Sequence, residues 1–295
     1  MDIQTRLRFL ALTIILTLTA CGTVPDAATP TLASVTQTSA PPTATPVPLA
    51  VMVNGEGVTL AEFNAELARF QTAQDTLGKT VSAEEAEQRV LDDLINQVLL
   101  AQGARDAGYT LEDTEFQARL EALTENAGGG EALSTWLANH GYTDESFRQS
   151  LKRAIESAWM RDKIISSLPS TADQVHVQQI LLYNEETADE VKSKLEAGAD
   201  FGELASAYDP RTSGELSWFP QGYLLEAKIE EAAFALDVGQ VSDVIATDIG
   251  FHLIMVLERD AQRPLSPDAS LALQDQALKD WLQKQREQST IKLLL

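Results

Sequence analysis

Apolar residues in positions 59–168 recur at the three- and four-residue spacing that is typical of amphipathic helices. Thr59 and Ser82 each stand three residues before a glutamate, and this spacing indicates a capping box at a helix start. Three further helices are expected at Thr110, Trp136 and Thr143. Because the aromatic residues of this region stand at helical spacing, we expect them in the core rather than in contact with a ligand.

Two segments outside this helical region also have patterns that predict secondary structure. A turn at Asn54-Gly55 between short apolar runs predicts a small hairpin before the first helix. Apolar residues at helical spacing within 266–295 predict one last helix, which begins at a capping serine, Ser266.

The start of the chain has the pattern of a secretory signal over residues 1–20. Arg6 and Arg8 precede an apolar run that is too short to span a bilayer. The run ends at Leu18-Thr19-Ala20-Cys21-Gly22, which looks like a bacterial lipobox, and cleavage there would leave Cys21 as a lipid-modified N-terminus. Cys21 is the only cysteine, so it has no partner for an internal disulfide. The alternative is an ordinary signal peptide that happens to contain a cysteine.

Residues 21–50 form a linker with a different composition. Six of the eleven prolines lie in residues 23–50, which contain no lysine or arginine and many threonines and alanines. Such a segment cannot bury a core. Since proline-rich chain extends by about 3.1 Å per residue, this linker predicts a spacer between a membrane and the folded part. We therefore expect a lipid-anchored protein at the cell membrane, facing the extracytoplasmic side.

The remaining chain is strongly acidic. Without the signal segment it has 20 basic against 43 acidic residues, a formal charge of −23. This charge argues against nucleic acid as a partner and against binding of anionic lipid through the folded surface. Simple solubility is the most economical explanation of the charge, and attraction of basic or unfolded polypeptides is the alternative.

Six short motifs follow one another between Val175 and Glu258. They are Val175–Leu181, Gly198–Ala205, Gly214–Phe219, Glu231–Leu236, Gly239–Ser242 and Thr247–Ile254. Their order, which is more specific than any one of them, resembles that of the parvulin family of peptidyl-prolyl cis-trans isomerases. The resemblance implies a parvulin domain over 172–261 with a small antiparallel sheet flanked by helices.

The parvulin resemblance also implies an apolar wall for the proline ring at Leu216, Leu225 and Ile229. The family usually has Met and Phe at the last two positions, so the wall expected here is aliphatic. Prolyl isomerisation breaks no covalent bond and must only lower a barrier of roughly 18–20 kcal/mol that amide resonance creates. The site therefore needs shape and oriented dipoles rather than a nucleophile.

The polar centre implied by the resemblance departs from the family at one position. The first strand usually contains histidine where this chain has Gln179, while His252, Thr247 and Asp209 match the family's polar positions. His176 lies three residues before Gln179, and on a strand an odd shift places it on the opposite face. Gln179 can donate and accept hydrogen bonds but cannot take a proton near neutral pH. We expect it to replace the histidine as a hydrogen-bonding group.

Residues 51–168 are similar in pattern to the N-terminal helical domain of SurA- and PrsA-type extracytoplasmic foldases. The similarity rests on Val53-Asn54-Gly55-Glu56 and on the segment Leu91–Leu100. It implies a helical chaperone domain, which the helix over 266–295 would complete. The expected fold class is α+β: a SurA-like helical domain, a parvulin domain and a C-terminal helix.

Two functions remain open, and both have unfolded or proline-containing exported polypeptides as partners. The first is a membrane-anchored peptidyl-prolyl isomerase and foldase. The second is a chaperone or scaffold whose degenerate parvulin domain binds peptide without much catalysis. A solute-binding lipoprotein is a weaker third alternative. We expect no cofactor and no metal, because no phosphate-binding loop or paired Cys/His spacing is present in the sequence.

Overall fold

The computed structural model describes residues 47–295, so the predicted signal peptide, Cys21 and most of the linker lie outside the described residues. The chain divides into two compact units. One unit ends at Ala158 and is joined by Ser289–Leu295, and the other comprises Trp159–Gln288. Within residues 47–295, no helix is long and apolar enough to cross a membrane.

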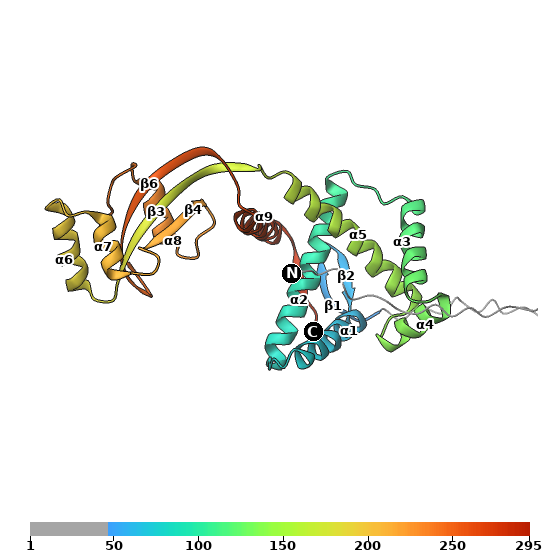
Figure 1. Cartoon of the computed structure of the whole chain (residues 1–295). Coiled ribbons are helices and arrows are strands. Elements are labelled where there is room, and N and C mark those ends of the chain that lie inside the picture. The colour runs from blue at the N-terminus through green and yellow to red at the C-terminus, as the bar shows by residue number, and fades with distance from the viewer. Residues whose placement is uncertain (1–46) are drawn as a thin grey trace, which may run out of the picture. The chain divides into compact units, whose positions relative to one another are not determined.

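The first unit combines helices with a small sheet (Figure 1). Its strands are β1 (Leu49–Val53), β2 (Glu56–Thr59) and β7 (Ile291–Leu293). Its helices are α1 (Leu60–Thr76), α2 (Ala83–Asp106), α3 (Asp113–Asn126), α4 (Gly130–Asn139) and α5 (Asp144–Ser166), whose last residues belong to the second unit.

The helix starts predicted at Thr59, Ser82 and Thr143 are confirmed. The start predicted at Thr110 is wrong, because α3 begins at Asp113 after Glu112, whose side chain makes no capping hydrogen bond. The hydroxyls of Thr59 and Ser82 accept hydrogen bonds from backbone N–H groups three residues later, at 3.1 and 3.2 Å. Thr143 caps α5 in the same way at 3.0 Å. The predicted hairpin joins β1 and β2 through Asn54 and Gly55, whose φ angles of 52° and 87° fit a tight two-residue turn.

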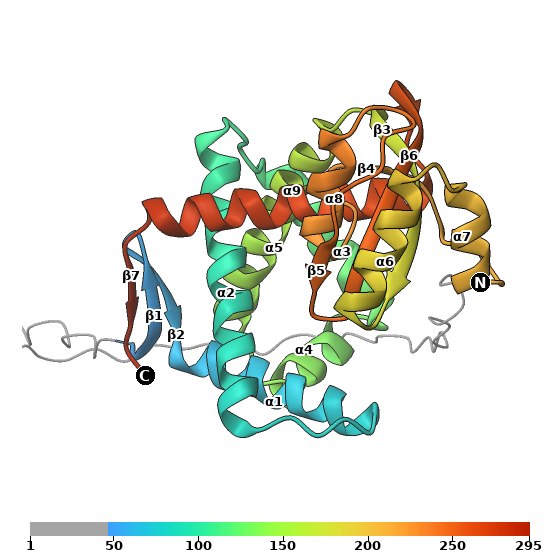
Figure 2. The same cartoon turned by 90° about the vertical axis from the view of Figure 1, so that its left-hand side faces the viewer.

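Strand β1 begins at Leu49, inside the segment that the sequence assigns to the linker. It lies between β2 and β7, and Val51 pairs with Leu293 (Figure 2). The helix predicted over 266–295 is therefore too long, because its last residues form β7. It stops at Gln288 because Asn54 binds the next residues: its side-chain carbonyl accepts the N–H of Thr290 at 2.8 Å.

The core of the first unit is built around α2. Its apolar stripe is buried as expected: Val90, Leu91, Leu94, Ile95, Val98 and Leu99. The expectation that the aromatic residues lie in the core is wrong for Trp136, which is 43% exposed. Helix α4 buries only Leu137, the next residue, and Trp136 instead stacks on His140 with 4.1 Å between ring centroids.

A buried ionic network joins α5 to the start of the first unit. Arg153 is 7% exposed and donates to the carboxylate of Glu62 at 2.7 Å. Glu156 is 2% exposed and pairs with Arg105, which also pairs with Glu56 at 2.6 Å. Because buried charges are costly without partners, the buried side chains of Arg153 and Glu156 depend on these ion pairs.

The second unit is a four-stranded antiparallel sheet with helices on both faces. Its strands are β3 (Thr171–Leu182), β4 (Glu215–Pro220), β5 (Ile245–Thr247) and β6 (Gly250–Pro264), in the order β4-β3-β6-β5. Its helices are α6 (Glu185–Glu196), α7 (Phe201–Tyr208), α8 (Ala227–Ala235) and α9 (Pro267–Gln288).

Each face of this sheet has its own core. The first core lies under α8 and contains Val175, Val177, Phe219, Ile229, Ala233, Ile254 and Val256. The second lies under α6 and α7 and contains Ile180, Leu182, Ala188, Val191, Phe201, Ala205 and Leu253. Odd residues of β3 thus face α8 and even residues face α6 and α7, as strand alternation requires. The α+β class predicted from the sequence is confirmed.

Candidate active site

The two long strands of the second unit carry the predicted polar residues on one face. Gln179 of β3 lies opposite Ile254 of β6, and two positions further along β3 Leu181 lies opposite His252. Strand β5 flanks β6 and places Ile245 opposite His252. Side chains alternate along a strand, so Gln179 and His252 project from the face that α8 covers.

Three of these side chains form one hydrogen-bonded chain. His252 is 1% exposed, and its two ring nitrogens contact different partners. Nε2 lies 2.9 Å from the Thr247 hydroxyl, and Nδ1 lies 3.2 Å from Oε1 of Gln179. The structure thus brings Thr247, His252 and Gln179 together.

The glutamine determines which nitrogen of His252 carries the proton. Oε1 of Gln179 only accepts hydrogen bonds, so Nδ1 donates to it, and Nε2 of the neutral ring then accepts from the Thr247 hydroxyl. When the ring is protonated, Nε2 donates to Thr247, whose hydroxyl can turn to the carbonyl of Gly250 at 3.2 Å. The threonine therefore has a suitable partner in both states.

Burial lowers the pKa of His252 below its ordinary value, because the positive charge of a protonated ring is poorly solvated there. The carboxylate of Glu226, at the start of α8, opposes this effect and raises the pKa by a smaller amount. The neutral ring is therefore the dominant form at neutral pH.

Asp209 lies at the end of α7 and organises the loop that follows it. Its carboxylate accepts hydrogen bonds from the N–H groups of Arg211 at 3.1 Å and Thr212 at 3.2 Å, and from the Thr212 hydroxyl. The hydrogen bond from the Thr212 hydroxyl is the main cause that lowers the pKa of Asp209, and the hydrogen bond from the Thr212 N–H lowers it further. Asp209 thus acts on the loop backbone, and its link to Gln179 is indirect.

Gly214 provides that link. Its N–H lies 3.4 Å from the Asp209 carboxylate, and its carbonyl accepts the backbone N–H of Gln179 at 2.8 Å. Its φ is +71°, and a Cβ atom at this position would lie 1.8 Å from the backbone oxygen of Gln179. Only glycine allows this approach, so the loop and β3 are joined in one fixed register.

His176 lies outside the polar chain, as its odd spacing from Gln179 predicts. Its Nε2 bonds to Glu215, its Nδ1 lies 3.4 Å from Glu258, and its ring stacks on Trp218 with 5.4 Å between centroids. These contacts hold His176 on the face opposite Gln179, so it is a structural residue of the sheet.

Only two of the three residues predicted to form the apolar wall pack on the core under α8. Leu216 is half-buried and packs on the core under α8, and Ile229 is a member of that core at 3% exposure. Leu225 is fully exposed and does not pack there. Leu224 and Tyr223 are the residues of this loop that pack on the core. Sequence reasoning missed them because the path of a loop follows from hydrogen bonds rather than from periodicity.

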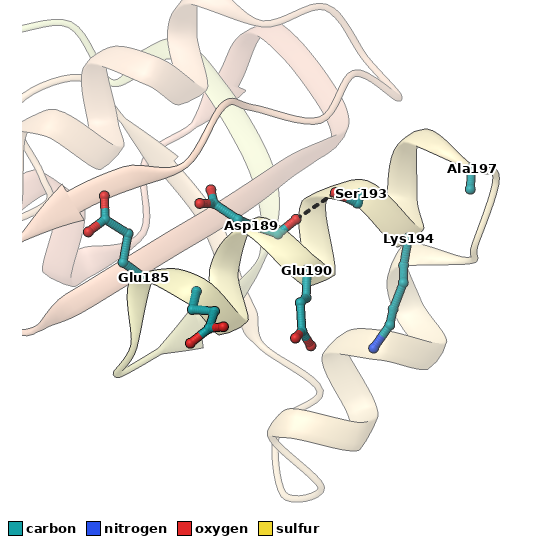
Figure 3. Close-up of a pocket in the computed structure, with 7 residues that line it drawn as sticks. Glu185, Asp189, Glu190, Ser193, Lys194 and Ala197 are labelled. Atoms are coloured by element: carbon teal, nitrogen blue, oxygen red, sulfur yellow. Dashed lines mark hydrogen bonds between the residues drawn. The ribbon is translucent and has the colours of Figure 1, made fainter.

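A separate hollow of about 790 Å³ lies on the outer face of α6 (Figure 3). The described residues that line it all belong to this helix and its end: Glu185, Glu186, Asp189, Glu190, Ser193, Lys194 and Ala197. These described residues all come from one helix, and they do not surround the hollow. In the part of the chain that the structure describes, no group of three or more His, Cys, Asp or Glu residues is arranged to hold a metal ion.

The comparison with protein families assigns both parts of the chain. Residues 163–260 match the family model of the PPIC-type PPIASE domain. Residues 3–161 match the model of the SurA-like N-terminal domain, which is more than half of the sequence. The chain therefore belongs to the parvulin-type SurA/PrsA family, and the predicted resemblance is confirmed.

Individual relatives agree with this assignment. Foldase protein PrsA of Geobacillus sp. (strain WCH70) is 31% identical over 186 residues, which cover 60% of this chain and 65% of the relative. Foldase protein PrsA of Geobacillus kaustophilus is 32% identical over 183 residues, covering 59% and 63%. The chain thus spans slightly less than two thirds of these relatives. A solved structure of peptidylprolyl isomerase (PrsA) from Bacillus cereus is 23% identical, covers 78% of this chain and 82% of its own, and has a TM-score of 0.43.

Proposed function

We propose that this protein is a peptidyl-prolyl cis-trans isomerase and foldase that acts on unfolded or proline-containing exported polypeptides. The observation that carries the proposal is the chain of hydrogen bonds from Thr247 through His252 to Gln179, inside a PPIC-type domain. Leu216 and Leu224 pack on the core under α8, which covers the same face of the sheet from which Gln179 and His252 project. Polar and apolar groups thus share one face of the sheet, as a proline-binding site requires.

The proposed chemistry is electrostatic. In the transition state the amide twists, its nitrogen becomes pyramidal and its carbonyl loses resonance, so oriented dipoles in a partly dry site act on the change. Thr247 and Gln179 hold the His252 ring in one orientation. Asp209 contributes by shaping the loop that joins β3 at Gly214, and Gln179 acts as a hydrogen-bonding group without a proton of its own.

We propose that the protein is attached to the membrane through Cys21 and faces the extracytoplasmic side. The support is the lipobox-like sequence, the absence of any other cysteine and the proline-rich linker after it. Replacing Cys21 with serine would then abolish labelling of the protein by a fatty acid. Labelling that persists after this change would contradict the proposal. We also propose the domain boundaries 51–168 for the SurA-like domain and 172–261 for the parvulin domain, followed by a C-terminal segment at 266–295 whose helix ends at Gln288.

The isomerase proposal is tested with a protease-coupled proline-peptide assay on the mature protein. A rate no higher than the uncatalysed one would remove the enzyme claim. Thr247→Val keeps the shape of the side chain but removes its hydroxyl, and we expect kcat/KM to fall by roughly tenfold, the value of one net hydrogen bond. Thr247→Ser keeps the hydroxyl and is the matched control, so it should retain most of the activity.

A chaperone without much catalysis is the second candidate, and a groove in the first unit favours it. The groove has a volume of about 580 Å³ between α1 and α4. Ala65, Ala68 and Ala73 line one side, and the half-exposed Trp136 lines the other. An apolar hollow of this size can hold part of an extended polypeptide.

Two measurements separate this candidate from the first. Suppression of client aggregation by the protein without residues 172–261 supports a chaperone, and its loss upon Trp136→Ala would locate the activity in the groove. Leu77→Ala is the control, because Leu77 is 65% exposed and does not line the groove. A wild type with no isomerase activity that gains it upon Gln179→His would show that the site is degenerate at that residue.

A further inference from the structure

Glu230 makes an unusual set of contacts with the loop that precedes its own helix. One carboxylate oxygen accepts the backbone N–H of Gly222 at 2.6 Å. The other accepts the N–H groups of Tyr223 at 3.0 Å and Leu224 at 2.9 Å. A single side chain from the first turn of α8 thus binds three consecutive backbone donors (Figure 1 shows α8 beside the sheet).

These contacts determine which way each residue of the loop points. With their N–H groups held by Glu230, Tyr223 and Leu224 pack on the core under α8. Leu225, the next residue, is fully exposed. The loop therefore has an inner apolar side and an exposed apolar tip, and the carboxylate maintains this arrangement.

The helix that carries Glu230 is itself joined to the polar chain. Lys228 donates from Nζ to the carbonyl of Ala246 at 2.9 Å, and Ala246 immediately precedes Thr247. Glu226, the residue before α8, acts electrostatically on His252. Helix α8 thus contacts the loop at 222–224 through Glu230 and the strand β5 beside Thr247 through Lys228.

We propose that Glu230 is a positioning residue that holds the loop 222–225 in the conformation that binds substrate. The inference rests on the proposed function, since the loop borders the proposed proline site. A charge-assisted hydrogen bond to a backbone N–H is stronger than a neutral one, and three of them on one carboxylate hold a loop that has no regular structure of its own. Glu230 touches no substrate in this role and acts through the loop.

The test compares Glu230→Gln with Glu231→Gln in the mature protein. Both variants remove one negative charge from α8, but Glu231 is exposed and forms none of these contacts. Hydrogen exchange reports the amides of residues 222–224, and titration with a proline-containing peptide reports the Kd. For Glu230→Gln we expect both exchange and Kd to rise by at least about tenfold, the loss of one charge-assisted hydrogen bond. We expect Glu231→Gln to change neither.

Unchanged exchange in Glu230→Gln would overturn the inference, and so would faster exchange with an unchanged Kd. If Glu230→Gln does not fold, the test is the protection of the wild-type amides 222–224 from hydrogen exchange. Protection no higher than that of a free peptide would overturn the inference. A wild type that binds the peptide but does not isomerise it would refute the proposed activity while leaving the positioning role supported, because exchange and Kd do not depend on turnover.

Discussion

Replacing Gly214 with alanine is a direct test of how the loop after Asp209 is joined to the sheet. The added Cβ atom would lie 1.8 Å from the backbone oxygen of Gln179, and no side-chain rotation relieves a contact between a Cβ and a backbone atom. The loop would have to move away from β3. That movement would break the hydrogen bond from the N–H of Gln179 to the carbonyl of Gly214, which is 2.8 Å long.

The expected loss of stability has two parts. Holding an L-residue at the φ of +71° found at Gly214 costs about 1–2 kcal/mol. Losing the buried backbone hydrogen bond costs about 1–2 kcal/mol more. We therefore expect the free energy of unfolding of the second unit to fall by about 2–4 kcal/mol, a large share of the 5–15 kcal/mol that is typical of a domain.

The matched control is Gly239→Ala. Gly239 lies in the same unit at a φ of +84°, but a Cβ atom there meets nothing within 4 Å. Hydrogen exchange of the central β3 amides, measured as a function of denaturant, gives the free energy of unfolding of this unit for both variants. We expect Gly214→Ala to cost at least about 1 kcal/mol more than Gly239→Ala, which has only the backbone penalty. Equal losses would refute the close approach to Gln179.

Three further predictions concern other parts of the structure. The pKa of His252 is lower in the folded protein than in the unfolded chain. Its neutral form therefore contributes stability that is fully present above about pH 6.5 and is lost as the pH falls through the folded pKa. In a pH series of unfolding experiments, this loss of stability should be absent in His252→Asn. Arg153→Met leaves the buried carboxylate of Glu62 without its cation and should cost about 3–5 kcal/mol in denaturant unfolding, whereas Arg148→Met, at an exposed pair, should cost less than about 1 kcal/mol; similar costs would contradict the burial argument. Leu225→Ser should weaken binding of a proline-containing peptide in a titration while leaving thermal stability unchanged, since this side chain packs on nothing in the core; unchanged affinity would exclude the exposed tip from the site.

The faces of the central strand could be predicted from the sequence because β3 alternates without interruption. Its pairing with β4 and β6 is irregular near His176 and Val177, but in both cases the bulge, with its one extra residue, lies in the partner strand. The odd spacing between His176 and Gln179 therefore separates them reliably. The same regularity places Gln179 and His252 on one face, where the structure joins them by a hydrogen bond.

The apolar wall could be predicted only in part, because one of its segments is a loop. Leu216 and Ile229 lie in regular elements and pack where their periodicity indicates. The choice between Leu224 and Leu225 depends on three hydrogen bonds to Glu230, and no spacing of apolar residues contains that information. The hydrogen bond from the N–H of Thr290 to Asn54, 236 positions away, cannot be predicted from a local pattern either.

The pairing of β1 with β7 has a consequence in time as well as in space. One edge of β1 stays open until Ile291–Leu293 arrive, although β1 is synthesised long before them. An open strand edge is a site where other chains add. Closing it also requires the ends of a very long loop to meet, which is slow. During folding, the sheet that β1 and β2 begin is therefore completed only when Ile291–Leu293 are present, and the second unit can fold in the meantime.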